Sequence, residues 1–563
     1  PLTMPDGQAF LNIVDPAFLN EAELIRGPAS TFWGNGSGGV LSLQTAEYPD
    51  RATARVRSMA GSYGMRKVEA EGAGSIGPHR VRAFVSHLRK DGYRSYSRVE
   101  HTWASVFSRW DLGPRTNLRA IGALVNSPQT EHPGSLTKEQ ARENPRMARP
   151  AFQETRAGKT SRQGQAGLHL THQTAAGLFS ATGYGLFRQV DNPLPFAYIW
   201  LRRSGGGLRA QLRDRSGPWQ WGLGVDAGLQ HDRRKNFNTV EPGPGDRIGQ
   251  PGDELQIHQV ETVSDGALFA RGTRRVGETR LSAGLRYDRI RFGMDDRFLE
   301  NGDQSGSRLF DHLSPTVGLS HRLGTATLYL NGSTSFETPT TTELVNRPDT
   351  ITGGFNQQVK PKRSRGAELG VRGTAESGRI GYDLAAYAYH VEGLLIRGER
   401  ADGRAFYQNE GTTRKIGVEA RLSWRPVRSL EAVLSTTQSS FTFTSGPFDG
   451  STIPAVPSSR ATGRLTWSPG DWYVRSTAEA VGAYPVNNEN TAENDAYAVV
   501  DVRLGHSGIE LGRSLTLQPF LGVENVTDTR YNGSVIPNTF GGRYYEPATD
   551  RSVRGGISLE FAN

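Results

Sequence analysis

The sequence EAELIRGPASTFWGNGSGGVLSLQT, residues 21–45, joins two short segments of alternating apolar character through a loop rich in glycine. The two segments, 22–25 and 40–43, have the length and the pattern of strands. The region between them includes Gly27, Pro28, Gly34, Gly36, Gly38 and Gly39. Glycine permits backbone geometry that is closed to other residues, and a glycine pair directly before a strand lets another backbone approach closely. The stretch is therefore predicted to pack against another part of the protein.

Two chemical motifs are suggested by this loop, and both fail on their context. Gly34, Gly36 and Gly39 spell G-x-G-x-x-G, but the dinucleotide-binding fingerprint requires a helix after the loop, and residues 40–43 continue as a strand. The nucleophile elbow G-x-S-x-G fails because Asn35 stands where its first glycine should be. Neither nucleotide binding nor a hydrolase is predicted from this stretch.

The composition excludes a helical membrane protein but permits a membrane barrel. Only 36% of the 563 residues are hydrophobic, and the sequence has no uninterrupted apolar run of the about 20 residues that a membrane-spanning helix needs. Barrel strands need apolar residues only at alternate positions, and 68 glycines with 9% aromatic residues suit strands, tight turns and interfacial girdles. The absence of cysteine excludes a disulfide framework and a thiolate metal site.

The net charge of +9 comes from basic residues scattered along the whole chain. A nucleic-acid-binding protein concentrates its basic residues in a local patch, so no nucleic-acid partner is predicted. Scattered arginines favour positions in a lumen or in loops, where they suit anionic ligands or anionic lipid headgroups.

A period-two pattern begins at Arg51 and recurs to the end of the chain. In residues 219–229, 281–288 and 416–424 one face is wholly apolar, and the charged residues lie on the opposite face. A soluble β-sandwich also alternates, but a charge on the lipid side of a barrel costs about 2–4 kcal/mol, so lipid explains why one face excludes charge. The residues predicted to face lipid include Trp219, Trp221, Leu281, Trp424 and Phe561.

Short turns alternate with long polar stretches between the predicted strands. Residues 113–115 read as a turn, whereas residues 126–162, 235–253 and 295–311 are too long for the connections of a compact domain. In an outer-membrane barrel the long loops face outside and the short turns face the periplasm. Residues 133–140 carry turn and capping chemistry, which predicts a small folded unit in the first long loop.

Residues 24–45 closely resemble the end of the plug domain of TonB-dependent outer-membrane receptors. The matching residues are Leu24, Ile25, Arg26, Gly27, Pro28, Ala29, Ser30, Gly34, Gly38, Gly39, Val40 and Thr45, with a loop one residue shorter than in the family. Further similar segments are 61–64, 284–288, 336–344, 359–361, 368–370, 409–411, 417–419 and 523–531.

The resemblance implies an all-β membrane protein, a 22-stranded antiparallel transmembrane β-barrel with the remnant of an N-terminal plug domain in its lumen. Residues 1–48 are expected to be the C-terminal part of the plug, and residues 49–563 the barrel with long extracellular loops. No signal peptide is visible after Pro1. The resemblance therefore implies that the first part of the plug and the segment that contacts TonB are missing from this chain.

The resemblance also implies a function. The protein is expected to be a monomeric receptor in the outer membrane of a Gram-negative-type bacterium, where it imports a ferric-siderophore or ferric-citrate-like chelate and is energised by TonB. Because the Fe(III) arrives already chelated, no cofactor, no dedicated metal site and no enzymatic activity are expected, and the sequence has no metal or phosphate-binding motif. Outer-membrane lipid and lipopolysaccharide are expected partners.

Three alternatives stay open. The ligand could be another scarce nutrient, such as cobalamin. A passive porin-like channel would need the same barrel, but it has no reason to carry the plug signature of residues 26–45. A soluble secreted β-protein that binds glycans would not need detergent.

The candidate ligand-binding residues lie in long or turn-rich segments. Arginine presents a planar fork of donors that suits carboxylate and catecholate oxygens. The candidates are Arg202, Arg203, Arg233, Arg234 and Tyr407. The alternative is that they are solvated loop charges or contacts to lipopolysaccharide.

A second group of residues is predicted to hold the plug in the barrel. The family pattern places a plug arginine against glutamates on the inner wall, which implies a lock between Arg26 and the two residues Glu368 and Glu419. Period-two phasing independently puts both glutamates inside the barrel. The alternative is that the glutamates pair with Arg372 and Arg421 on their own strands.

Overall fold

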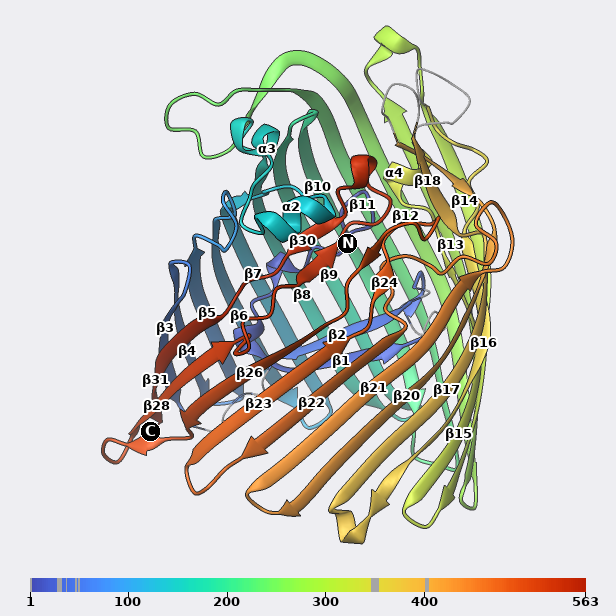
Figure 1. Ribbon diagram of the computed structural model, residues 1–563. Coiled ribbons are helices and arrows are strands. Elements are labelled where there is room, and N and C mark those ends of the chain that lie inside the picture. The colour runs from blue at the N-terminus through green and yellow to red at the C-terminus, as the bar shows by residue number, and fades with distance from the viewer. Residues whose placement is uncertain are drawn as a thin grey trace.

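The computed structural model describes residues 3–27, 33–36, 38–45, 48, 51–345, 354–399 and 405–562. In these ranges, 22 long antiparallel strands form one closed barrel (Figure 1). The strands are β3 (Thr53–Gly61), β4 (Met65–Ile76), β5 (His79–Lys90), β6 (Val99–Gly113), β7 (Thr116–Glu131), β8 (Gly158–Thr174), β9 (Gly177–Leu194), β10 (Ala197–Asp214), β11 (Trp219–Val240), β12 (Gln250–Val276), β13 (Thr279–Asp296), β14 (Gly306–Leu323), β15 (Ala326–Glu337), β16 (Lys362–Ala375), β17 (Ile380–Glu392), β20 (Thr412–Val427), β21 (Leu430–Phe443), β22 (Ser459–Trp467), β23 (Trp472–Val481), β26 (Tyr497–His506), β28 (Leu515–Glu524) and β31 (Ser552–Ala562). Each strand pairs with the next, and β3 pairs with β31 to close the barrel, which confirms the predicted fold class.

The alternation in the sequence corresponds to the two faces of this wall. On β11, Leu223 and Leu229 are 54% and 57% exposed on the outer face, whereas Asp232 on the inner face is fully buried. Of the residues predicted to face lipid, Trp221 is half-buried on the outer face, and the exposed ones are Trp219, Leu281, Trp424 and Phe561. The apolar outer face has no protein partner in the described chain, so it requires lipid.

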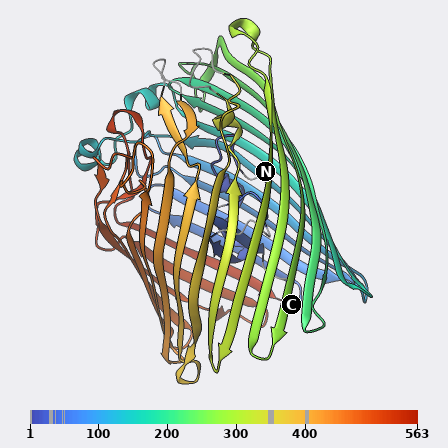
Figure 2. The same ribbon diagram turned by 90° about the vertical axis from the view of Figure 1, so that its right-hand side faces the viewer.

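The N-terminal segment lies inside the barrel (Figures 1 and 2). Two 3₁₀ turns, η1 (Leu11–Ile13) and η2 (Pro16–Phe18), lead into β1 (Leu19–Arg26), which pairs antiparallel with β2 (Gly39–Thr45). The Asp15 carboxylate caps η2 by accepting a hydrogen bond from the Ala17 amide at 2.9 Å. The two strands predicted around the glycine-rich loop are confirmed, and they pair with each other.

Long connections gather at one end of the barrel, and short turns at the other (Figure 1). The three long loops are shorter than predicted, because residues 132–157, 241–249 and 297–305 are the actual connections. The strands continue past the predicted ends, where polar residues on both faces hide the period-two pattern. In the first loop the predicted capping is confirmed, since Thr137 and Gln140 form a capping box at α2 (Lys138–Glu143).

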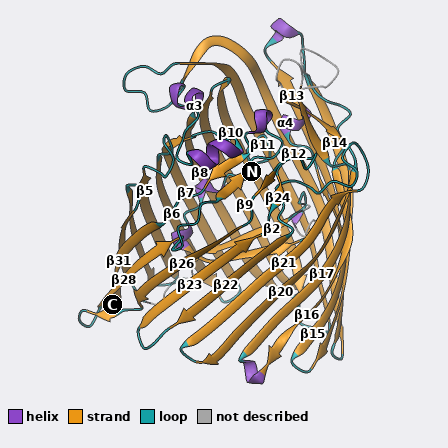
Figure 3. Cartoon of the chain, viewed as in Figure 1, coloured by secondary structure: helices purple, strands orange, loops and turns teal. Residues whose placement is uncertain are grey.

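Short helices and short strand pairs lie in the connections between the barrel strands (Figure 3). They are α3 (Pro150–Glu154), η3 (Leu299–Asn301), α4 (Thr341–Leu344), η4 (Glu376–Gly378), η5 (Phe540–Gly542), β18 (Leu395–Glu399) with β19 (Ala405–Asn409), β24 (Tyr484–Pro485) with β25 (Glu493–Asn494), β27 (Ile509–Glu510) against β28, and β29 (Asn532–Val535) with β30 (Tyr545–Pro547). Among the described residues, none of the helices has the length and apolar character needed to cross a membrane.

Candidate functional site

One buried carboxylate fastens the N-terminal segment to the inner wall. Asp15 is fully buried. Its carboxylate accepts hydrogen bonds from the Lys67 ammonium at 2.7 Å on β4 and from the Ser86 hydroxyl on β5. The Trp103 indole on β6 donates to the carbonyl of Asn12 at 2.9 Å. Side chains of three adjacent strands therefore hold the turn between η1 and η2.

Aromatic side chains reinforce this attachment. Phe18 packs between Phe84 and Phe107, with ring centroids 5.2 and 5.9 Å away. Phe10 is buried against Trp103 and Val125 in a separate cluster. Burying a phenylalanine contributes about 1.5–3 kcal/mol, so these contacts explain why a short segment stays inside a wide barrel.

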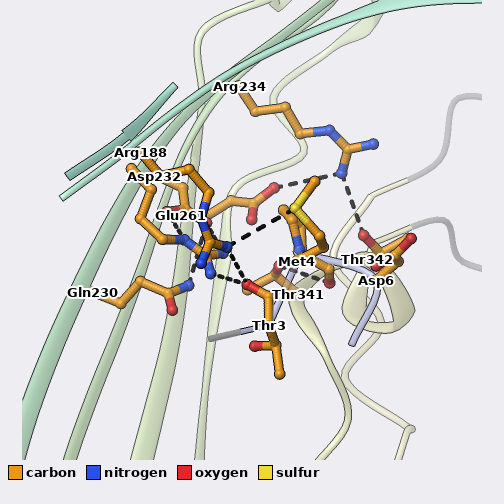
Figure 4. Close-up of polar contacts among 12 residues, drawn as sticks. Thr3, Met4, Asp6, Arg188, Gln230, Asp232, Arg234, Glu261, Thr341 and Thr342 are labelled. Atoms are coloured by element: carbon orange, nitrogen blue, oxygen red, sulfur yellow. Dashed lines mark hydrogen bonds and ion pairs between the residues drawn. The ribbon is translucent and has the colours of Figure 1, made fainter. Parts of the chain in front are cut away.

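Nearer the end of the barrel with long loops, an arginine pair holds residue 3 (Figure 4). Arg203 on β10 binds both carboxylate oxygens of Asp232 on β11, at 2.7 and 2.6 Å, and it donates to the Thr3 carbonyl. Arg188 on β9 donates to the same carbonyl at 2.9 Å and to Gln163 at 2.6 Å. Two buried guanidinium groups thus converge on one backbone oxygen.

Arg234 on β11 extends this group toward the loop between β15 and β16. Its guanidinium lies 3.7 Å from the Glu261 carboxylate and donates to the Thr342 hydroxyl at 3.4 Å. The Thr342 amide and the Thr341 hydroxyl in α4 donate to the carbonyl of Pro5 at 3.1 and 3.2 Å (Figure 4). Among the described atoms, the Nε of Arg234 and one oxygen of Glu261 are buried without a hydrogen-bond partner. One N–H donor of Arg234 and one carboxylate oxygen of Glu261 beside residues 3–9 are therefore not used by other protein groups.

Tyr407 of β19 lies on another side of the same loops. The Asn356 amide donates to its carbonyl at 3.2 Å. Burial raises the pKa of the Tyr407 phenol, and the nearby carboxylates of Glu343 and Asp6 act in the same direction. Burial also raises the pKa of Glu343, which caps its own helix α4. The phenol therefore keeps its proton and can donate it to an acceptor.

Of the five predicted ligand-binding residues, four divide between the two faces of the barrel wall and one lies in the loops. Arg203 and Arg234 point into the lumen near residues 3–9, and Tyr407 lies in the loops above them. Arg202 and Arg233 are register partners on the outer face, away from the lumen. The sequence could have predicted this outward position. Arg202 and Arg233 lie an even number of residues from Leu208 and Leu229, which are exposed on the outer face of the same strands. Sequence reasoning missed three partners in the lumen, Arg188, Asp232 and Glu261.

The predicted lock residues lie close to the plug hairpin. The backbone of Gly27 passes the hydroxyl of Tyr389, so that a Cβ there would lie 3.1 Å from it. Tyr389 interacts electrostatically with both Glu368 and Glu419. Glu368 also accepts a hydrogen bond from Tyr329. The side chain of Arg26 lies outside the described residues.

A closed barrel with an apolar band around its outer wall, a charged lumen and an N-terminal segment held inside it is typical of receptors of the bacterial outer membrane. Within the described ranges, no group of His, Cys, Asp and Glu side chains is arranged to hold a metal ion. The family model "TonB dependent receptor-like, beta-barrel" matches residues 90–526. The chain therefore belongs to the TonB-dependent receptor family, whose members are transport receptors and not enzymes.

The relatives include receptors for metal chelates. The chain is 24% identical to the metal-pseudopaline receptor of Pseudomonas aeruginosa over 76% of its own length and 64% of that protein. It is 22% identical to the ferrioxamine B receptor of Salmonella typhimurium, over 98% and 81% of the two chains. The unliganded ferric citrate transporter FecA has the same fold, with a TM-score of 0.82 and 15% identity over 100% of this chain and 87% of that one.

Proposed function

We propose that this receptor imports a ferric chelate of the siderophore or ferric-citrate type and is energised by TonB. The observation that carries the proposal is the convergence of Arg203, Arg234 and Tyr407 around residues 3–9, on the lumen side of the long loops. Donors of this kind suit the carboxylate, hydroxamate or catecholate oxygens of an iron chelate. The names of the relatives, which are receptors for chelated metals, point the same way.

In this proposal Arg234 and Tyr407 contact the ligand, and Arg203 positions the N-terminal loop. Arg203 is committed to Asp232 and Thr3, whereas the Nε of Arg234 has no partner among the described atoms. Arg202 and Arg233 are left out of the ligand site because their side chains lie on the outer wall. In this proposal residues 1–48 act as the C-terminal part of the plug, residues 49–563 form the barrel, and the receptor functions as a monomer.

Ligand binding by the detergent-purified protein tests the proposal. Titration with ferric citrate, ferrioxamine B, a ferric catecholate and cobalamin should show binding of a ferric chelate. Arg234→Gln and Tyr407→Phe should each weaken it at least tenfold, which corresponds to about 1.4 kcal/mol. Arg233→Gln is the matched control, and its affinity should equal that of the unmodified protein. Binding of cobalamin alone, or an open conductance in planar bilayers without ligand, would favour the alternatives.

We further propose that Arg26 locks the plug hairpin to Glu368 and Glu419. The proposal is supported by the passage of Gly27 beside the hydroxyl of Tyr389, which interacts electrostatically with both glutamates. Removing one partner of a buried ion pair costs about 3–5 kcal/mol. Arg26→Ala and Glu419→Ala should therefore each accelerate hydrogen exchange in residues 40–43, and the double variant should be little worse than either one. Small, additive effects would mean that the glutamates pair with Arg372 and Arg421 instead.

A further inference from the structure

The connection between β15 and β16, residues 338–361, enters the lumen instead of rising from the wall. β14 begins at Gly306, but its pairing with β15 starts only at Thr316. β15 itself continues to its end in pairing with β16. Near that end, Phe336 is fully buried in the same hydrophobic cluster as Phe292 from the inner face of β13. The upper part of β15 has therefore left β14 and turned inward, together with the loop that follows it.

This β15–β16 loop is a folded unit. Leu344 and Val359 are buried in the cluster around Phe336. Thr340 caps α4 through a capping box, and the Leu344 carbonyl accepts a hydrogen bond from the Asn356 amide at 2.6 Å. Because close-packed cores have low compressibility and transmit strain, a displacement on one side of the loop is passed to the other side.

The loop holds the N-terminal segment at two separate places. In the plug hairpin, the side-chain amide of Asn35 donates to the Thr338 hydroxyl at 2.8 Å, and the Thr338 amide donates back to the side-chain oxygen of Asn35 at 2.8 Å. The Pro5 carbonyl accepts hydrogen bonds from the Thr342 amide at 3.1 Å and from the Thr341 hydroxyl at 3.2 Å. One loop therefore contacts both the hairpin β1–β2 and the start of the described segment.

The same loop contacts the two residues that are proposed to bind the ligand. Arg234 donates to the Thr342 hydroxyl at 3.4 Å (Figure 4). The side-chain amide of Asn356 donates to the Tyr407 carbonyl at 3.2 Å. A ligand that contacts Arg234 and Tyr407 therefore acts on two sides of one folded loop.

We propose that Asn35 and Thr338 are positioning residues that couple the ligand site to the plug hairpin. A chelate bound to Arg234 and Tyr407, as in the proposed function on which this step rests, restrains the β15–β16 loop, and the loop restrains the hairpin through the Asn35–Thr338 pair. Restraint of this kind needs no new fold and is measurable as slower amide hydrogen exchange. This role goes beyond chelate import, because it assigns the control of the hairpin to a loop of the barrel.

A double-mutant cycle without ligand tests the connection in the detergent-purified protein. Asn35→Ala removes both hydrogen bonds to Thr338, and Leu344→Ala loosens the core of the loop, so each should accelerate amide exchange in β2 about tenfold. Asn35→Ala/Leu344→Ala should exchange no faster than the faster single variant, because both changes break the same connection. Leu136→Ala is the matched control. It truncates a fully buried leucine in the loop between β7 and β8, and exchange in β2 should equal that of the unmodified protein.

Measurements with ligand separate the two places at which the loop holds the N-terminal segment. Ferric citrate, ferrioxamine B and a ferric catecholate are the probes, and one that binds should slow exchange about fivefold in residues 3–9 and in β2 of the unmodified protein. In Asn35→Ala it should still slow residues 3–9, which are held through Pro5, but no longer β2. Because coupling is reciprocal, Asn35→Ala should weaken chelate binding by no more than about fivefold.

Three results would overturn the proposal. Multiplied effects in the double variant would show that Asn35 and Leu344 act independently. An equal response to Leu136→Ala would show a general loosening of the loops, and slower exchange of β2 in chelate-bound Asn35→Ala would show that the ligand reaches the hairpin by another route. Heat-modified electrophoretic mobility should confirm that every variant is a folded barrel. If no ferric chelate binds while the double-mutant cycle gives the expected result, the connection is confirmed and the proposed import function alone fails.

Discussion

Arg202 and Arg203 are adjacent in the sequence, and the wall of the barrel separates them. Arg203 faces inward, where its side chain is 1% exposed and holds Asp232 and the Thr3 carbonyl. Arg202 faces outward, where its side chain is 26% exposed, pairs with Asp191 and stacks on Trp200. Arg233 and Arg234 on the next strand divide in the same way. The position in the two-residue period, and not the residue type, therefore decides what each arginine does.

The two faces also differ in what a charge costs. An inward arginine is enclosed by protein. If it is removed, its carboxylate partner stays buried, and water cannot take the place of the lost guanidinium group. An outward arginine near the loops remains in contact with water or headgroups, where an ion pair contributes little. Substitutions on the same strand should consequently have very different effects on the two faces.

The largest expected difference in stability is between the variants Arg203→Ala and Arg202→Ala. Arg203→Ala should reduce the free energy that holds the N-terminal segment in the barrel by about 3–5 kcal/mol, because Asp232 stays buried without its partner. Arg202→Ala should cost about 0–1 kcal/mol. Hydrogen exchange of residues 3–18 measures both, and Arg203→Ala/Asp232→Ala should recover part of the loss. Equal effects of the two single variants would mean that the faces are not distinct.

A smaller difference is expected when a charge is introduced on the apolar part of the wall. Leu223→Arg, on the outer face, should cost about 2–4 kcal/mol when the barrel is in a bilayer. Gln220→Arg, on the opposite face of the same strand, should change stability by only about 0.5 kcal/mol. Urea unfolding in lipid vesicles compares the two. A larger loss for Gln220→Arg would reverse the assignment of the faces.

The smallest expected difference concerns two tryptophans of β6. Trp103 faces inward and donates to the Asn12 carbonyl, whereas Trp110 stacks on His79 on the outer face, with ring centroids 4.9 Å apart. Trp103→Phe should loosen residues 11–18 by about 0.5–1.5 kcal/mol through the lost hydrogen bond. Trp110→Phe should leave hydrogen exchange in residues 11–18 unchanged. A response to Trp110→Phe would indicate that the outer face also controls the plug.

The candidate site was only partly predictable. Period two correctly places Glu368 and Glu419 on the inner face, and the same rule separates Arg203 from Arg202 once the phase of Leu208 is used. The partners Asp232 and Glu261 stand on neighbouring strands at positions set by register. Register depends on turn geometry and on strand ends. The predicted loop 235–253 ended β11 too early and began β12 too late, because β11 runs to Val240 and β12 begins at Gln250.

The sequence by itself determined the class of protein, the outer and inner faces of the strands, the family and the paired segments of the plug hairpin. These properties depend on residues that are close together in the sequence, namely a two-residue apolar period and a glycine-rich motif. Only the tertiary structure decided that the Asp15 carboxylate meets Lys67 and Ser86, and that Arg188 and Arg203 both donate to the Thr3 carbonyl. The physical reason is that closure of the barrel brings distant strands around one lumen, and no local pattern records which residues then face each other across it.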